Sequence, residues 1–441
     1  IAAWLVSLCA FPGRGLFEWL LVLPLAAPSY LLAFAYGSLT WPGGLIDLPV
    51  AGFWGAAFVY AIGLYPYVYL AMRAGFAAHS ASALEAARTL GAGPLDLFWR
   101  VALPLSRPSL VAGGALAAME IAADYGAAQH FGLTTLSTAI FRVWYSNGAP
   151  GGALQIAAPL LLVALALLVL ERRSRGAAAY ASPRRQANPR FRLSAAAQAG
   201  ACVFCLSLVA LGAAAPMAWL GHLALQHGGV GDLIQPLLNT VALATAGAAI
   251  TLVLAIAIAA TAARANHIAR LAPLAASVGY AAPGAVIALG ALSLFAAARA
   301  AGWAGGLGAG LALTALLWTY SARFAAAGAQ PVEAGLARVS KNVRDAAATL
   351  GANAWRRLIK IELPIAAPSL VAGGVFLFVE IVKELPATLI LRPLAFDTLA
   401  VRTYLYASDE RMHEAAAPAL LIFAAGLLPI VFLARRAQGR S

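Results

Sequence analysis

The segment LPLSRPSLVAGG at residues 103–114 recurs as LPIAAPSLVAGG at residues 363–374, an offset of 260 residues. The same offset relates TLGA at residues 89–92 to TLGA at residues 349–352. Agreement over so many positions at one spacing predicts that the chain is a tandem duplication of one structural unit.

The composition is that of a membrane protein. Of the 441 residues, 62% are hydrophobic and 11% are charged, and the mean hydropathy is +0.82. Soluble globular chains are about half apolar and about a quarter charged. The apolar residues form windows of about 20, the length of a helix that crosses a bilayer. The sequence therefore predicts an all-α, polytopic membrane protein with eleven spans, at about 1–11, 16–39, 51–72, 108–128, 152–170, 198–220, 237–263, 271–297, 305–327, 368–390 and 415–434.

The distribution of basic residues predicts the orientation of these spans. The net charge is +13, but the basic runs lie between apolar windows, which indicates the positive-inside pattern rather than nucleic-acid binding. Residues 171–195 contain seven arginines, two prolines and one acid, so they are expected to be a cytoplasmic linker between repeats at 1–170 and 196–441. With this linker and the C-terminus inside, 24 of the 30 Lys and Arg residues fall on the cytoplasmic side.

The span count predicts repeats of about six helices each. The sequence starts at Ile1 within an apolar window, so we expect the first helix of the first repeat to be missing. An even number of spans per repeat makes the two repeats parallel, related by an axis along the membrane normal.

Two predicted cytoplasmic loops, within 73–107 and 323–367, share one pattern. Each has an acid and two alanines, then a glycine that suits the left-handed end of a helix, then a Leu-Pro that suits a helix start. The acid suits the first turn of a helix, so each loop is expected to form a short helix parallel to the membrane. The residues are Glu85, Ala86, Ala87, Gly91 and Pro104 in the first loop and Asp345, Ala346, Ala347, Gly351 and Pro364 in the second.

These loops resemble the "EAA" coupling loops of binding-protein-dependent ABC importer permeases. The resemblance implies the type I ABC importer transmembrane fold and a short helix that docks on a cytoplasmic ATP-binding subunit, present in two copies. Asp345 stands where the first loop has Glu85, which keeps the charge. The chain has no GxxxxGK[ST] motif, so ATP and Mg²⁺ are expected on that separate subunit. We expect a transport subunit, not an enzyme, with no bound cofactor.

Acidic residues inside the spans are candidates for the translocation path, because ionisable groups there are costly. Glu120 and Asp124 share one helix face by their i, i+4 spacing, as do Glu380 and Glu384. Four carboxylates around a path suit a hard cation, with Glu120 and Glu380 as transient metal ligands. The alternative is that Asp124 and Glu384 lie in water at the helix ends, with Lys383 as a local partner.

Further strings resemble the fused permeases of ferric-iron importers. They are residues 17–24 (FEWLLVLP), 120–126 (EIAADYG), 138–144 (TAIFRVW), 383–389 (KELPATL) and 396–400 (FDTLA). The resemblance implies a bacterial inner membrane, a periplasmic solute-binding protein that delivers Fe(III), and contact with membrane lipid. Permeases for thiamine, polyamine or phosphonate share this architecture. An ion-coupled secondary transporter is the rival from another class, but such a carrier has no ATPase to dock.

Four weaker patterns receive a structural interpretation. Cys202 and Cys205 have redox or metal spacing but lie in an apolar helix, and are interpreted as small apolar residues. His222, His227 and Asp232 are interpreted as a solvated loop. Tyr65, Tyr67 and Tyr69 fit an interfacial aromatic belt. The pairs at 113–114 and 373–374 are glycines that allow close helix packing.

Overall fold

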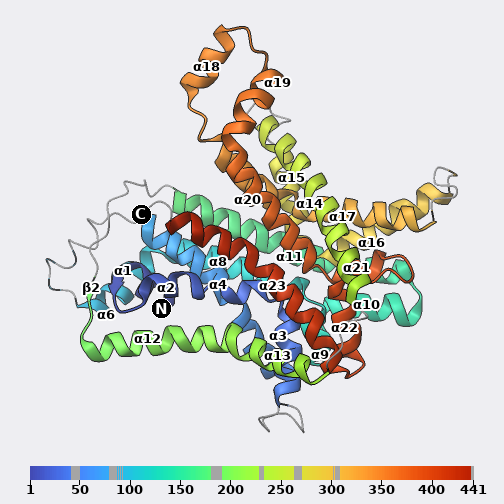
Figure 1. Cartoon of the computed structure of the whole chain (residues 1–441), viewed down its shortest axis with the longest axis horizontal. Coiled ribbons are helices and arrows are strands. Elements are labelled where there is room, and N and C mark those ends of the chain that lie inside the picture. The colour runs from blue at the N-terminus through green and yellow to red at the C-terminus, as the bar shows by residue number, and fades with distance from the viewer. Residues whose placement is uncertain are drawn as a thin grey trace. The chain divides into compact units, whose positions relative to one another are not determined.

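The computed structural model describes residues 1–40, 50–78, 87, 89, 91, 93–179, 191–227, 233–262, 271–300, 302 and 308–438. These residues are helical apart from turns and two strands of two residues each, β1 (Cys9–Ala10) and β2 (Phe191–Arg192), which pair in parallel (Figure 1). The all-α prediction is therefore confirmed.

By its internal contacts, the chain forms two compact units. Unit 1 contains residues 1–138 and 162–226, and unit 2 contains residues 139–161 and 227–441. These units differ from the predicted repeats, because residues 196–226 pack in unit 1. The repeat boundaries stay a prediction, since compact packing and sequence repetition are separate criteria.

Unit 1 is built from short and long helices around an aromatic core. Trp4 lies with its ring 5.8, 5.4 and 5.7 Å from the rings of Phe76, Phe98 and Phe191. The free thiols of Cys9 and Cys205 are buried in the same core. The elements are α1 (Ala2–Leu8), α2 (Arg14–Leu20), η1 (Leu23–Ala26), α3 (Ser29–Thr40), α4 (Gly52–Ala78), α6 (Pro94–Leu97), η2 (Phe98–Ala102), α7 (Leu103–Leu105), α8 (Arg107–Ala123), α9 (Gly126–His130), α12 (Ala195–Val209), η3 (Ala210–Ala214) and α13 (Ala215–His227).

Unit 2 is built around the long helices α14, α17 and α20. Helix α14 packs against α17 and α20, and α17 packs against α20. The elements are α14 (Ile234–Ala262), α15 (Leu271–Ala281), α16 (Gly284–Ala300), α17 (Gly308–Leu336), α18 (Lys341–Thr349), α19 (Ala354–Arg357), η6 (Leu358–Glu362), α20 (Leu363–Val382), α21 (Pro386–Leu391), α22 (Leu399–Ser408) and α23 (Met412–Gln438). Helices α10 (Leu136–Asn147) and α11 (Pro150–Ala179) each run from one unit into the other.

The membrane-spanning character of the chain is confirmed, but several predicted spans are broken. Within the described residues, five helices are long and apolar enough to cross a membrane, or eight if each bent pair is one span. The predicted spans 16–39 and 271–297 bend by 87° and 109°. Pro28 and Pro283 lie at these bends, and a proline lacks the N–H and pushes the preceding residue out of helical geometry.

Other predicted spans had wrong ends. The predicted spans 108–128 and 368–390 end earlier, at Ala123 and Val382, and each is followed by a separate short helix. The predicted span 305–327 ends too early, because α17 continues to Leu336.

The same pairs of helices pack in both units. In unit 1, α4 contacts α8 and α3, and α3 contacts α9. In unit 2, α17 contacts α20 and α16, and α16 contacts α21. Each long helix therefore lies between a helix that follows a loop and a helix that starts at a bend.

Candidate functional site

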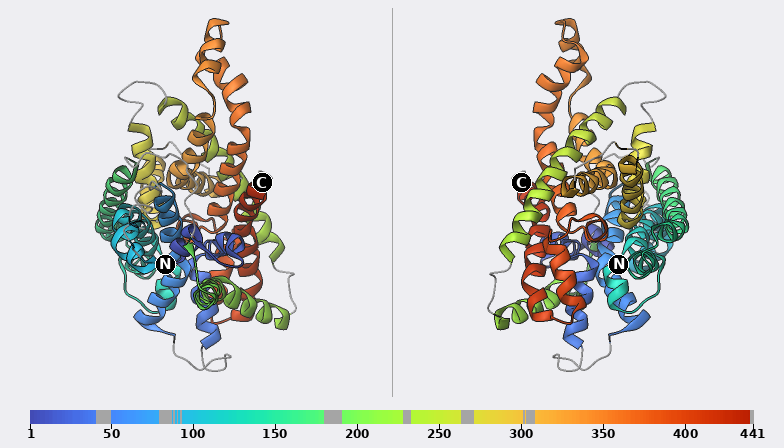
Figure 2. Two further views of the ribbon diagram at one scale, coloured as in Figure 1. Left: turned by 90° about the vertical axis from the view of Figure 1, so that its left-hand side faces the viewer. Right: turned by 90° about the vertical axis from the view of Figure 1, so that its right-hand side faces the viewer.

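The second predicted coupling loop is a hairpin of short helices at one end of α20. Helices α18 and α19 project from the rest of unit 2 in every view (Figures 1 and 2). Helix α18 begins after Ser340, whose hydroxyl accepts a hydrogen bond from the Val343 N–H at 3.4 Å. The prediction that Asp345 lies in the first turn is wrong, because this serine cap starts the helix four residues earlier.

The end of α18 is the predicted glycine stop. Gly351 has φ 78°, and its N–H donates to the carbonyl of Ala348 at 3.0 Å. The N–H of Ala352 donates to the carbonyl of Ala347 at 3.0 Å. This pair of bonds is the Schellman motif, which requires the left-handed conformation that glycine adopts most easily. Gly91 in the first loop has φ 83°.

A π-helix precedes the Leu-Pro of each loop. The π-helices η2 (Phe98–Ala102) and η6 (Leu358–Glu362) are separated by the offset of the repeat. A proline ring clashes with the carbonyl four residues earlier, and a wider turn relieves that clash. Pro104 and Pro364 each lie second in the α-helical segment that follows the π-helix. The prediction that Pro364 opens a new helix is wrong, because the helical turns are continuous from Ala354 to Val382, so α19 and α20 form one rod.

An ion-pair cluster joins α18 to this rod. The Glu362 carboxylate lies 3.4 Å from Arg344 Nε and 3.1 Å from Arg357 Nε. The Arg344 guanidinium also donates to the carbonyl of Leu336, at the end of α17, at 2.7 Å. The cluster therefore fixes α18 to the two long helices on either side of it.

The surface that this hairpin presents is partly apolar. Leu350 is 87% exposed and Trp355 is 66% exposed, although both are large hydrophobic side chains. Of the predicted alanine pair, Ala346 is exposed and Ala347 is buried. In the first loop, Glu85 and Ala86 lie outside the described residues.

Glu380 of α20 and Glu384, which lies just beyond the end of this helix, both have partners within unit 2. Glu380 forms an ion pair with Lys383, with Oε1 to Nζ at 2.7 Å. Glu384 is only 6% exposed and accepts hydrogen bonds from the N–H groups of Ala387 and Thr388, each at 3.1 Å. The alternative that places Glu384 in water beside Lys383 is therefore wrong.

Glu120 of α8 and Asp124, the residue that follows this helix, lie at the matching places in unit 1. Asp124 Oδ1 accepts a hydrogen bond from the Ala127 N–H at 2.9 Å, and its carboxyl group also interacts with the Ser29 hydroxyl. Glu120 is partly buried. Within the described residues, no group of three or more His, Cys, Asp or Glu side chains is placed to hold a metal ion. Glu120 and Glu380 as transient ligands of the cargo stay a prediction.

One charged residue of unit 2 was missed by the sequence reasoning. Arg323 was counted in a cytoplasmic loop, but α17 continues for thirteen more residues to Leu336. At 1.5 Å per residue, this places Arg323 about 20 Å from the end of the helix. The apolar residues on both sides of Arg323 were the signal that the helix continues.

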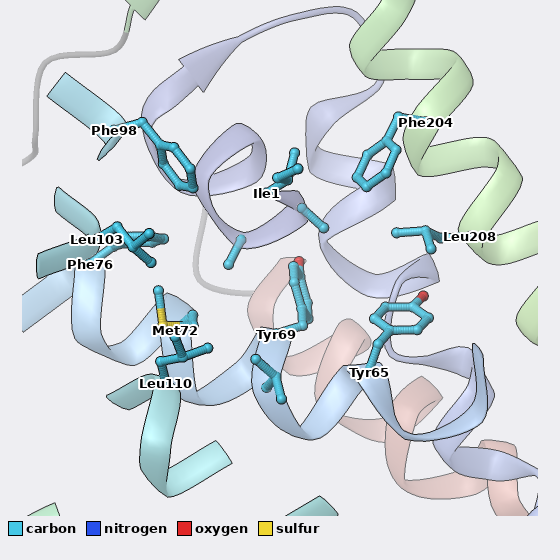
Figure 3. A pocket seen from close by; sticks show the side chains of 13 residues that line it. Ile1, Tyr65, Tyr69, Met72, Phe76, Phe98, Leu103, Leu110, Phe204 and Leu208 are labelled. Carbon is cyan, nitrogen blue, oxygen red and sulfur yellow. The ribbon is translucent and has the colours of Figure 1, made fainter. Parts of the chain in front are cut away.

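The tyrosines of α4 do not form an exposed aromatic belt. Tyr65 and Tyr69 line an apolar pocket of about 250 Å³ in unit 1, with Met72 and Phe76 on the same helix (Figure 3). Tyr69 is buried and donates a hydrogen bond to the carbonyl of Glu18 at 3.3 Å. The interpretation of Tyr65 and Tyr69 as interfacial residues is wrong, because they face the interior of the unit.

Two further interpretations concern α12 and α13. Cys202 is a free thiol whose Sγ lies 3.4 Å from the carbonyl of Pro12. This contact agrees with the interpretation of Cys202 as a packing residue of the helix. His222 and His227 lie in the last turns of α13, where His222 Nε2 hydrogen-bonds Gln226 at 3.0 Å. Asp232 lies outside the described residues.

Known proteins similar to this chain are transport permeases. The family described as binding-protein-dependent transport system inner membrane component matches residues 4–176. The Fe(3+)-transport system permease protein FbpB 2 of Haemophilus influenzae is 25% identical over 99% of this chain and 85% of its own length. The molybdenum transport system permease protein ModB of Escherichia coli is 31% identical over 38% of this chain and 79% of its own length. The sulfate transport system permease protein CysT of Salmonella typhimurium is 32% identical over 29% of this chain and 49% of its own length.

Proposed function

The chain belongs to the binding-protein-dependent transport system inner membrane components, and on that premise we propose that it carries ferric iron into the cytoplasm. Its fold is that of a type I ABC importer permease, and it is a multi-pass protein of the inner membrane. The similarity to a ferric-iron permease over nearly the whole chain supports the iron assignment. The molybdenum and sulfate permeases match shorter stretches.

The energy for this transport comes from a separate ATP-binding subunit, bound in two copies at the two coupling loops. The exposed Leu350 and Trp355 of the second loop support this docking, because large apolar side chains in water indicate an interaction surface. A periplasmic binding protein delivers the cargo to the opposite side. The linker and the C-terminus are cytoplasmic in this arrangement.

Reconstitution with purified partners tests the cargo. The chain is placed in proteoliposomes with its ATPase, and uptake is measured with binding proteins for iron, molybdate, sulfate, thiamine, polyamine or phosphonate. Ferric iron should enter only with ATP and the iron-binding protein. Uptake of another cargo, with none of iron, would replace the iron assignment and leave the importer assignment intact. Uptake driven by a proton or ion gradient without ATPase would overturn both.

Two pairs of substitutions test the candidate residues. Glu85→Arg with Asp345→Arg should abolish both ATPase association and uptake, because it replaces the acid of each motif by a residue of opposite charge. Unchanged association would show that these acids do not dock the ATPase.

Glu120→Gln with Glu380→Gln should slow iron uptake while ATPase association stays normal. Uptake at the unsubstituted rate would remove these carboxylates from the path.

A further inference from the structure

The Glu384 carboxylate organises the start of α21. Its Oε1 accepts from the Ala387 N–H, and its Oε2 accepts from the N–H and, at 3.0 Å, from the hydroxyl of Thr388. The Thr388 hydroxyl in turn lies 2.6 Å from the Tyr320 hydroxyl of α17. Both carboxylate oxygens thus accept hydrogen bonds from the protein.

The same carboxylate lies against the start of α16. A Cβ atom placed on Gly284, the first residue of α16, would lie 2.4 Å from Glu384 Oε1. Only a residue without a side chain allows this approach. Gly284 follows the 109° bend between α15 and α16, so the bent helix and the short helix α21 both begin at one acid.

Arg323 of α17 faces this acid. The Cβ placed on Gly284 would also lie 2.7 Å from Arg323 Nη1. The carboxylate of Glu384 and the guanidinium of Arg323, which belong to different elements, therefore both lie against Gly284. No ion pair joins them, and Nη1 is buried without a hydrogen bond to the residues described. A charge inside an apolar bundle is costly unless an opposite charge lies nearby, and Glu384 is that charge.

Unit 1 has the same arrangement with different residues. Asp124 takes the place of Glu384, and accepts from the N–H of Ala127 in α9. The Ser29 hydroxyl, at the start of α3 after the 87° bend, interacts with Asp124. The bends have the sequences AAPS at 26–29 and AAPG at 281–284, so Ser29 and Gly284 correspond. A shorter acid is reached by a serine, whereas a longer acid requires a glycine.

We propose that Asp124 and Glu384 are positioning residues, each tying the end of its long helix to a bent helix and a short helix, and that Arg323 is the counter-charge that holds Glu384 there. They therefore do not bind cargo directly. This role rests on the proposed function in one respect: α20 is continuous with α19, so a displacement of the coupling hairpin by an ATPase would move Glu384, α16 and α21 together (Figure 1).

Thiol labelling of α21 tests the tie without cargo or ATPase. Leu391, the last residue of α21, is 4% exposed, so Leu391→Cys should react slowly with a maleimide in the purified protein. The background carries Cys202→Ala, and the remaining cysteines, Cys9 and Cys205, are buried. Glu384→Gln should raise the labelling rate about tenfold or more, because an amide cannot accept both N–H bonds.

Arg323→Gln should also raise the labelling rate, and its effect should be smaller once Glu384→Gln is present. Glu380→Gln is the matched control, since it removes a nearby carboxylate, in the last turns of α20, and should leave the labelling rate unchanged. Unchanged labelling in Arg323→Gln, or strictly additive effects, would show that Arg323 does not act through Glu384. An equal rise of the labelling rate in Glu380→Gln and Glu384→Gln would show that α21 responds to the loss of any nearby carboxylate. An unchanged rate in Glu384→Gln would overturn the proposal.

A rescue experiment separates this role from a general loss of folding. Gly284→Ser alone should be damaging, because its side chain meets Glu384. Gly284→Ser combined with Glu384→Asp recreates the Ser29–Asp124 arrangement. It should restore slow labelling of Leu391→Cys, and it should return the ratio of iron taken up to ATP hydrolysed to that of the unsubstituted protein. A double variant no better than Gly284→Ser would overturn the proposal. If the protein carries no iron, the labelling results still decide the role of the tie.

Discussion

At the residue scale, neighbouring glycines have different roles. Gly113 of α8 packs against α4, where an added Cβ would lie 2.8 Å from the Cα of Val68. Gly114 has open space at the same position. The prediction that both glycines allow close packing is confirmed for Gly113 and wrong for Gly114, because successive helix residues point about 100° apart.

This difference predicts opposite effects of two adjacent substitutions. Gly113→Ala should destabilise the protein by about 1–3 kcal/mol, since the methyl group meets backbone that cannot move away. Gly114→Ala should be neutral or stabilise by about 0.5–1 kcal/mol, because alanine restricts the unfolded chain. Thermal unfolding in detergent, followed by a thiol-reactive dye or by circular dichroism, measures both. Equal losses would mean that α4 and α8 do not approach this closely.

At the scale of elements, the coupling hairpin is held by charge and displays apolar side chains. Glu362 has a side chain only 12% exposed and lies between Arg344 and Arg357. The side chains of Leu350 and Trp355 are far more exposed to solvent than that of Glu362. The orientation of α18 therefore depends on a few polar contacts, while its outer surface is left for a partner.

Removal of the acid at the centre of the cluster should loosen α18. Glu362→Gln leaves two arginines without a charged acceptor, which costs about 1–3 kcal/mol of local stability. Limited trypsin digestion should then cut faster at Lys341, on α18. Glu333→Gln is the matched control, because Glu333 lies near the end of α17 and makes no ion pair with the residues described. If both variants were cut at Lys341 at the same rate, the ion-pair cluster would not be what holds α18 in place.

The exposed indole should contribute to binding of the ATPase. Trp355→Ala should weaken that association about tenfold or more, as expected for a large aromatic side chain at the centre of an interface. Leu394→Ala is the control, because Leu394 is 100% exposed and lies after α21, beyond the end of α20 opposite the hairpin. Pull-down of the purified ATPase, followed by titration, measures the difference. A similar loss in both variants would argue against a specific contact at Trp355.

At the scale of the whole molecule, the charges predict which loops share a side of the membrane. The hairpin of α18 and α19 and the basic linker at 171–195 carry arginines and are expected inside. The turn after α21 is expected outside. The long helix α20 and the short helix α21 separate the hairpin from that turn.

Labelling of single cysteines should report this orientation. In a Cys202→Ala background, Leu394→Cys should react with a membrane-impermeant maleimide in intact spheroplasts. Leu350→Cys should react only after the membrane is opened, although Leu350 is 87% exposed. The reverse pattern would invert the predicted topology. Reaction of both residues in intact spheroplasts would show that α20 does not separate two sides.

The sequence alone determined the features that depend on local chemistry. Apolar windows and the glycine stop of α18 each follow from residues close together in the chain. The recurrence of the two loops at one offset also needs no coordinates. These predictions succeed because a backbone in lipid, or at the end of a helix, must satisfy its own hydrogen bonds.

Only the tertiary structure decided the partners of the charged residues. Glu384 lies among the starts of α16 and α21 and faces Arg323. Sequence spacing placed all four acids on two similar faces, but it could not show which oxygens were already engaged. That is set by packing between segments distant in sequence, because a buried charge is stabilised by whichever groups the fold brings beside it.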